Sequence, residues 1–267
     1  MPQTIYLSHG VISYEDTPAN AGKPVLVWLH AFPQDRTMWE PQRQHFAASH
    51  RVIVPDLPGF GDSAFNEGWT IDSAADVVAE LLVALQITEQ VVVGGLSMGG
   101  YAALAFARRY AEKLKGLILA DTKADGDDET AKAGREKTIA LALEKGSAGV
   151  IEAMLPRLLG ATTQEKSPET IAQVRSIAGK QSAHGVIAGL KALRDRPDAT
   201  PGLKQIAVPT LVIVGAEDLV TPIAKAEVLA NEIPGAKLAI LQGVGHLSNL
   251  EDSMSFNAVV ETFLAGV

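Results

Sequence analysis

One serine, flanked by glycines at fixed spacing, is the residue in this sequence that most suggests chemistry. It lies in Gly95-Leu96-Ser97-Met98-Gly99, which follows the β-branched run 91–93 and precedes an alanine-rich stretch from Tyr101 onward. This order predicts a strand, a sharp turn and a helix, with the Ser97 hydroxyl pushed into a cleft at the turn. The helix N-terminus also offers free backbone N–H groups to an oxyanion. Ser97 is therefore a candidate nucleophile.

A serine hydroxyl needs a base to remove its proton, and two loops late in the chain offer partners. His246, next to Gly245, follows the apolar run 237–241, and Asp218 follows the apolar run 210–214. The order Ser97, Asp218, His246 is the one expected for a nucleophile at such a turn. Asp121, which follows the strand after the serine turn, and Glu217 remain alternatives for the acid.

The other histidines fit less demanding roles. His9, His45 and His50 fall in turns or on helix faces and are interpreted as solvated or structural. His184 lies in a helical segment late in the chain and is a candidate for contact with a substrate.

Strands and helices alternate around these residues. Short apolar runs predict strands buried on both faces, and amphipathic segments between them predict helices. The predicted strands are two within 3–16, then 24–29, 51–55, 91–93, 117–120, 208–214 and 237–241, and the predicted helices include about 36–48, 71–86, 222–232 and 252–265. The pattern indicates an α/β fold with a mostly parallel, doubly wound sheet.

Residues 122–205 interrupt this alternation. They contain no strand-like run but hold helical patterns over about 128–145, 147–159, 168–179 and 182–194. We therefore expect a core of residues 1–121 and 206–267 and a helical lid of residues 122–205 over the carboxyl ends of the strands. The lid is rich in apolar side chains, among them Met154, Leu155, Leu158 and Leu159. We expect some of these side chains to seal the lid against the sheet and others to line a mostly apolar substrate pocket.

Composition excludes several classes of function. The 267 residues carry a formal net charge of −8 and no cysteine, which argues against nucleic-acid or anionic-membrane partners and against thiol chemistry. No dinucleotide fingerprint, phosphate-binding loop or zinc-binding helix motif is present, so we expect no cofactor and no metal. No apolar run approaches the ~18 residues of a membrane span, and no signal peptide is visible. We expect a cytoplasmic protein; the sequence leaves its oligomeric state open.

Five motifs together resemble the α/β-hydrolase superfamily, and within it the single-domain carboxylesterases and the 3-oxoadipate enol-lactonase branch. They cover the core of the chain in the expected order: Leu29-His30-Ala31-Phe32-Pro33, residues 56–63, residues 95–100, residues 218–222 and Gly245-His246. The resemblance implies Ser97 as nucleophile, His246 as general base and acid, and Asp218 as the residue that orients the imidazole.

The resemblance also implies an oxyanion hole made by the backbone N–H groups of Phe32 and Met98. One position departs from the family pattern, because the usual His-Gly is His30-Ala31 here. If that position needed a positive φ, Ala31 would cost on the order of 1 kcal/mol and could tilt the Phe32 N–H away. Backbone angles that suit alanine would remove the penalty.

The expected function is hydrolysis of small, short-to-medium acyl esters through an acyl-enzyme. Hydrolysis of an enol-lactone and peroxide-dependent perhydrolysis are alternatives that use the same residues. A ligand-binding receptor on a hydrolase scaffold is the non-enzymatic alternative, although a binder has no need of nucleophile, base and acid together. Serine at the turn argues against dehalogenases and epoxide hydrolases, whose ester chemistry needs a carboxylate nucleophile.

Overall fold

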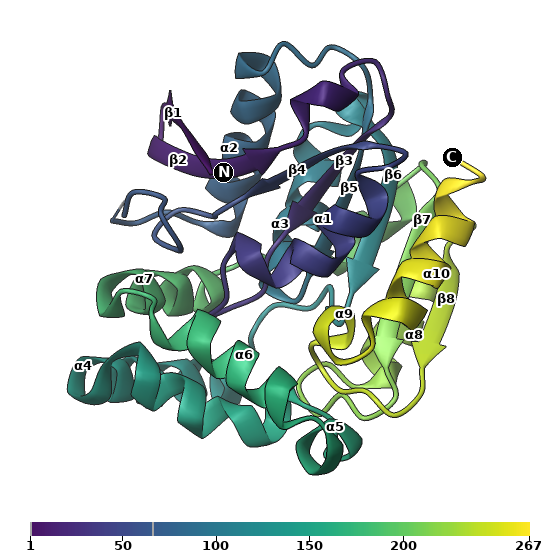
Figure 1. Ribbon diagram of the computed structural model, residues 1–267. Coiled ribbons are helices and arrows are strands. Elements are labelled where there is room, and N and C mark those ends of the chain that lie inside the picture. The colour runs from purple at the N-terminus through teal and green to yellow at the C-terminus, as the bar shows by residue number, and fades with distance from the viewer. Residues whose placement is uncertain (1, 66) are drawn as a thin grey trace.

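A mixed sheet forms the centre of the computed structural model, which describes residues 2–65 and 67–267. Figure 1 shows the sheet with helices on both faces. In these residues the strand order is β1-β2-β4-β3-β5-β6-β7-β8. The strands are β1 Gln3–Leu7, β2 Gly10–Asp16, β3 Val25–Leu29, β4 Arg51–Pro55, β5 Val91–Leu96, β6 Leu114–Ala120, β7 Thr210–Gly215 and β8 Lys237–Leu241. The β1–β2 hairpin joins β4 antiparallel, and β4, β3, β5, β6, β7 and β8 pair in parallel. The sheet is thus mostly parallel, as the sequence predicted.

The central strands are apolar throughout because both of their faces are covered. In β3, Val25 and Val27 face one buried cluster, which the helices α2 (Ile71–Ala84), α3 (Met98–Arg109) and α8 (Ile223–Glu232) complete. Leu26 and Trp28 alternate with them and face a second cluster with α1 (Glu40–Phe46) and α10 (Ser253–Leu264). This is the period of two that a strand imposes on its side chains.

Some helix boundaries differ from the expected ones. The segment predicted as one helix near 36–48 is a short 3-10 helix η2 (Arg36–Trp39) followed by α1. A short helix α9 (Ser248–Glu251), which was not predicted, precedes α10, the predicted last helix. Asp35 caps η2 and Asp252 caps α10, which explains where each new segment begins. Three further 3-10 helices are η1 (Pro18–Asn20), η3 (Ala111–Lys113) and η4 (Thr200–Gln205).

Four helices are inserted between β6 and β7. They are α4 (Glu129–Leu158), α5 (Ala161–Lys166), α6 (Pro168–Gly179) and α7 (Ala183–Arg194). The two helices predicted over 128–145 and 147–159 are both present, because α4 consists of two helical segments that meet at Gly146, whose φ of 64° and ψ of −169° are not helical. Helix α5 was not expected. In Figure 1 the insertion lies beyond the ends of the strands toward which the arrows point, so it faces the loops that carry the candidate site residues.

No helix in the described part of the chain is long and apolar enough to cross a membrane.

Candidate active site

Ser97 is held in a strained conformation between β5 and α3. Its φ of 55° and ψ of −111° lie in a region that residues with a side chain rarely adopt. A Cβ on Gly95 would lie 2.1 Å from the carbonyl oxygen of Gly99, and a Cβ on Gly99 would lie 2.0 Å from that of Leu29. Only glycine fits these two positions, so the backbone around Ser97 is fixed by contacts on both sides. Ser97 is almost buried, with 9% of the residue exposed.

His246 and Asp218 are brought together by the loops after β8 and β7. Nδ1 of His246 lies 2.8 Å from Oδ2 of Asp218, and both residues are buried. Thr221 donates its hydroxyl to the same Asp218 oxygen at 2.7 Å, while the N–H groups of Val220 and Thr221 donate to Oδ1 at 2.7 and 2.9 Å. This arrangement requires the proton of a neutral His246 to be on Nδ1, which leaves Nε2 free to accept a proton.

The electrostatics of this loop keep Asp218 ionised. Burial alone would raise the pKa of its carboxyl, but the attraction of His246 and the hydrogen bonds from His246 and Thr221 lower that pKa to about 2. Sequence reasoning did not single out Thr221, although its position three residues after Asp218 is that of a residue able to close such a turn.

Asp121 and Glu217, the alternative acids, are occupied elsewhere. Asp121 accepts a hydrogen bond from the N–H of Gly215 at 2.8 Å and another from the hydroxyl of Ser248, so it ties together the loops after β7 and β8. Burial raises the pKa of the Asp121 carboxyl well above its usual value, and the nearby Asp218 carboxylate raises it further. Glu217 accepts from the N–H and hydroxyl of Thr162 in α5. In the described structure it is Asp218 that is hydrogen-bonded to His246.

The predicted oxyanion-hole residues lie at adjoining backbone segments. Met98 is the first residue of α3, and Phe32 follows β3, which pairs in parallel with β5 at Leu29 and Gly95. Among the residues that the structure describes, neither N–H finds an acceptor in the protein. Among the described residues, the non-glycine residues with positive φ are Gln86, Ser97 and Asp121. Ala31 therefore does not have a positive φ, and the penalty of about 1 kcal/mol for alanine at such an angle does not arise.

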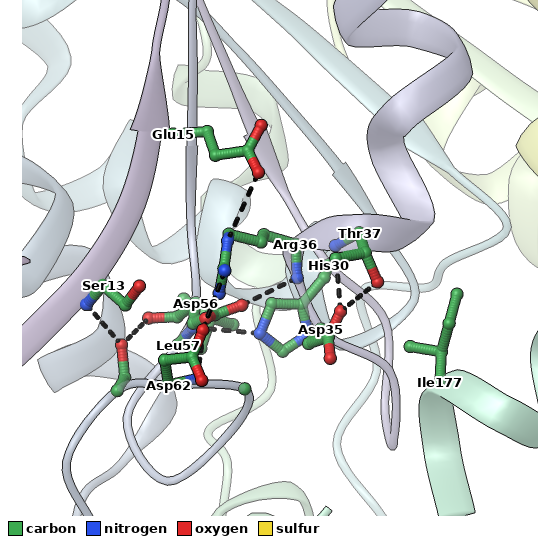
Figure 2. Close-up of polar contacts among 12 residues, drawn as sticks. Ser13, Glu15, His30, Asp35, Arg36, Thr37, Asp56, Leu57, Asp62 and Ile177 are labelled. Carbon is green, nitrogen blue, oxygen red and sulfur yellow. Dashed lines mark hydrogen bonds and ion pairs between the residues drawn. The ribbon is translucent and has the colours of Figure 1, made fainter. Parts of the chain in front are cut away.

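A buried polar network, shown in Figure 2, holds the loop that contains Phe32. His30 accepts the N–H of Leu57 on Nε2 and donates from Nδ1 to the carbonyl of Ala31, each at 2.9 Å. These partners suit only the neutral ring, and burial accordingly lowers the pKa of His30. Asp56, fully buried, accepts from the backbone N–H and the guanidinium of Arg36. The loop after β3 is thus fastened to the loop after β4.

A cavity of about 560 Å³ lies between the insertion and the core. Its walls include Phe32, Tyr101, which is one helical turn after Ser97, and Thr221. Met154 and Leu158 line it, and Leu155 and Leu159 are packed in a buried cluster with residues of the sheet, so this set is divided between lining and sealing as expected. His184 is exposed and is not among the lining residues.

The lining is more polar than the sequence suggested. Lys123, Asp127, Asp128, Arg135 and Arg157 all contribute to it. Arg135 forms an ion pair with Asp127 at 2.9 Å, which lets charged side chains occupy a wall that composition alone would assign to apolar residues. In the described residues, no group of three or more His, Cys, Asp or Glu side chains could hold a metal ion.

The family model for the alpha/beta hydrolase fold matches residues 24–253. The chain belongs to the α/β-hydrolase family. Its sequence is 30% identical over 249 residues to 3-oxoadipate enol-lactonase 2 of Acinetobacter baylyi, an alignment that covers 93% of this chain and 91% of the relative. This α/β hydrolase therefore falls in the branch that contains enol-lactonases and esterases.

Solved structures agree with this assignment. A thermophilic esterase from Thermogutta terrifontis, determined with malate bound, superposes with a TM-score of 0.93 at 38% identity, covering 100% of this chain and 98% of the other. An enol-lactonase from Burkholderia xenovorans superposes with a TM-score of 0.91 at 28% identity, covering 98% and 100%. The hydrolase is thus similar over its whole length to proteins described as esterases and as lactonases.

Proposed function

We propose that this α/β hydrolase is a serine carboxylesterase that cleaves small, short-to-medium acyl esters through an acyl-enzyme. The observation that carries the proposal is the strained Ser97 at the start of α3, on the same sheet edge as the hydrogen-bonded His246 and Asp218. Strained backbone clusters at functional sites, and here it falls on a serine with a φ of 55°. A base and an acid on the same sheet edge are what favour an enzyme over a pure binding protein, which needs no such set.

In the proposed mechanism Ser97 Oγ attacks the ester carbonyl while Nε2 of His246 takes its proton. Asp218 holds the Nδ1–H tautomer and stabilises the imidazolium that forms. The N–H groups of Met98 and Phe32 stabilise the oxyanion. His246 then gives the proton to the leaving alkoxide. A water molecule attacks the acyl-enzyme with His246 again acting as base, the bond between the acyl group and Ser97 Oγ breaks, and His246 returns the proton to Oγ as the carboxylic acid leaves.

No hydrogen bond joins Ser97 to His246 in the described residues. Contacts of this type are often loose without substrate and tighten in the Michaelis complex, so the proposal is compatible with the unliganded geometry.

The cavity supports small substrates. Its volume of about 560 Å³ falls within the range of roughly 300–1,000 Å³ that small-molecule sites occupy. Each methylene that the cavity buries contributes ~0.8 kcal/mol, or about a fourfold gain in kcat/KM. The gain ends when the apolar part of the cavity, including Met154, Leu158 and Leu190, is filled.

Lactone hydrolysis is the second candidate function. It is favoured by the similarity to two proteins described as enol-lactonases, and it needs no change in the proposed roles, because a lactone is a cyclic ester. Attack by peroxide on the same acyl-enzyme would give perhydrolysis instead of hydrolysis.

A substrate panel tests these assignments. We expect kcat/KM for p-nitrophenyl esters to rise from acetate to butyrate or hexanoate and then fall toward palmitate, with smaller values for lactones and no gain in peracid when peroxide is added. A clear preference for lactones would replace the esterase assignment by a lactonase. A rise that continues to palmitate, with activation at an oil–water interface, would refute the small-substrate claim.

A further inference from the structure

One face of the insertion rests directly on the loops after β3 and β4. Three of the residues in this contact are Gln181, in the turn before α7, and Gly185 and Gly189, which are one helical turn apart on α7. We call these three residues the α7 seat. Gln181 is 6% exposed, so its amide must find all its partners in the protein.

The Gln181 amide joins both core loops at once. Oε1 accepts the N–H of Gly61 at 2.8 Å, and Nε2 donates to Oδ2 of Asp35 at 2.9 Å. The second hydrogen of Nε2 goes to the carbonyl of Ile177 at 2.8 Å. Turning the amide over would oppose its oxygen to a carboxylate and its NH₂ to an N–H group. The side chain is therefore fixed in one orientation.

The two glycines bring α7 against the backbone of the same loops. A Cβ on Gly185 would lie 1.9 Å from the carbonyl oxygen of Gly59. A Cβ on Gly189 would lie 2.7 Å from Cζ of Phe60 and 3.2 Å from two ring carbons of Phe32. The Phe32 and Phe60 rings pack edge to face, with centroids 6.0 Å apart. Helix α7 thus supports the side chain of the residue whose N–H is assigned to the oxyanion hole.

Asp35 transmits the second contact to the same loop. Its Oδ1 accepts the N–H of Thr37 at 2.9 Å and so caps η2, while its Oδ2 binds Gln181 and, at 3.0 Å, the ammonium of Lys180. Asp35 lies three residues after Phe32, and Gln34 closes the intervening turn by donating its N–H to Ala31 at 2.9 Å. The turn that carries Phe32 is therefore held on one side by His30 and on the other by the insertion.

We propose that Gln181 and Gly189 are positioning residues for the oxyanion hole: the insertion, seated through them, fixes the direction of the Phe32 N–H. This inference rests on the proposed function, since it concerns an N–H that acts only on a developing oxyanion. The insertion then has a part in the chemical step as well as in the walls of the cavity. A substitution that weakens the contacts of the α7 seat with the core loops is expected to weaken binding of the transition state more than binding of the substrate.

Two variants and one matched control test the proposal. Gln181→Met keeps the length of the side chain and removes its hydrogen bonds. Gly189→Ala adds one methyl group against Phe60 and Phe32, while alanine itself favours the helix over glycine. Gly179→Ala, at the end of α6, adds the same methyl group where no atom lies within 4 Å. For each we would measure kcat, KM, the inhibition constant of an alkyl boronic acid that mimics the tetrahedral adduct, and the midpoint of thermal unfolding.

Complete loss of one oxyanion donor costs about 10²–10³ in kcat, so a displaced donor is expected to cost about 10- to 100-fold. We expect Gln181→Met and Gly189→Ala each to lower kcat and to weaken boronic-acid binding by this factor, with KM changed less than about threefold. Gly179→Ala remains within about twofold of the wild type. If Gln181→Met fails to fold, Gly189→Ala carries the test alone.

Folded variants that keep the wild-type kcat and boronic-acid affinity, or that change only KM, would overturn the positioning role. That result is distinct from failure of the proposed function. In the latter case Ser97→Ala would remain active, or the boronic acid would not inhibit the wild-type protein at all.

Discussion

Replacing Asp218 and Asp121 in turn by asparagine separates the carboxyl group that serves the proposed base from the one that supports the loops. At position 218 the asparagine oxygen keeps the N–H groups of Val220 and Thr221, which donate at 2.7 and 2.9 Å. Its NH₂ group then takes the place of Asp218 Oδ2, which in the wild type lies 2.8 Å from Nδ1 of His246. A donor there stabilises the tautomer with the proton on Nε2, which cannot accept a proton from Ser97. Loss of the correct tautomer costs about 10⁴ in kcat, or about 5 kcal/mol of activation free energy.

At position 121 the same change has a small kinetic effect. The asparagine oxygen keeps the Gly215 N–H, and the hydroxyl of Ser248 can rotate to accept from the new NH₂ group. We expect a change in kcat below about tenfold. In the wild type the folded-state pKa of Asp121 is raised, so the folded protein binds a proton that the unfolded chain releases. Wild-type stability therefore falls as pH rises above the unfolded pKa of Asp121, and that decrease is absent in Asp121→Asn.

The assay is steady-state hydrolysis of p-nitrophenyl butyrate at constant pH, together with urea unfolding at about pH 5 and about pH 8. Both variants are expected to keep KM nearly unchanged, and Asp121→Asn is expected to gain stability relative to the wild type at the higher pH. If Asp121→Asn lost far more kcat than Asp218→Asn, the acid of the reaction would belong to the loop after β6 and the assignment made from the Asp218–His246 hydrogen bond would be wrong.

Two further expectations follow from the same site. The acid limb of log(kcat/KM) against pH is expected to have a slope of one: only the neutral His246 ring can accept the serine proton, and Asp218, with a pKa of about 2, stays ionised above about pH 4. If log(kcat/KM), measured immediately after a pH jump, fell with a slope of two, a second group would have to be deprotonated for activity. Dialysis against EDTA is expected to leave kcat unchanged, because backbone N–H groups rather than a Lewis acid stabilise the oxyanion in the proposed mechanism. Loss of activity that a divalent ion restores would rule that mechanism out.

The turn at Ser97 could be predicted from the sequence because its constraints are local. Gly95 and Gly99 are separated by a few residues, and the apolar runs beside them indicate where strand and helix begin. The neighbourhood of His246 and Asp218 followed from topology, since the carboxyl ends of parallel strands meet at one edge. No argument about their 2.8 Å hydrogen bond was possible before the structure, because it depends on the angles of two loops.

Contacts between distant segments escaped prediction for the same reason. Asp121 accepts a hydrogen bond from Gly215, 94 residues later, and Gln181 donates one to Asp35, 146 residues earlier. No sequence pattern indicates either pair. The polar cavity wall was missed because the ion pair between Arg135 and Asp127 forms only when the insertion is folded.

The central claim, that Ser97 is the nucleophile, is tested most directly by labelling it. A p-nitrophenyl alkylphosphonate should release one equivalent of nitrophenol and add its phosphonyl group to the peptide that contains Ser97, as read by mass spectrometry. Ser97→Ala should take up no label, stay folded, and retain less than about a thousandth of the wild-type kcat. Label on another residue, or an alanine variant that keeps more activity than this, would contradict the account.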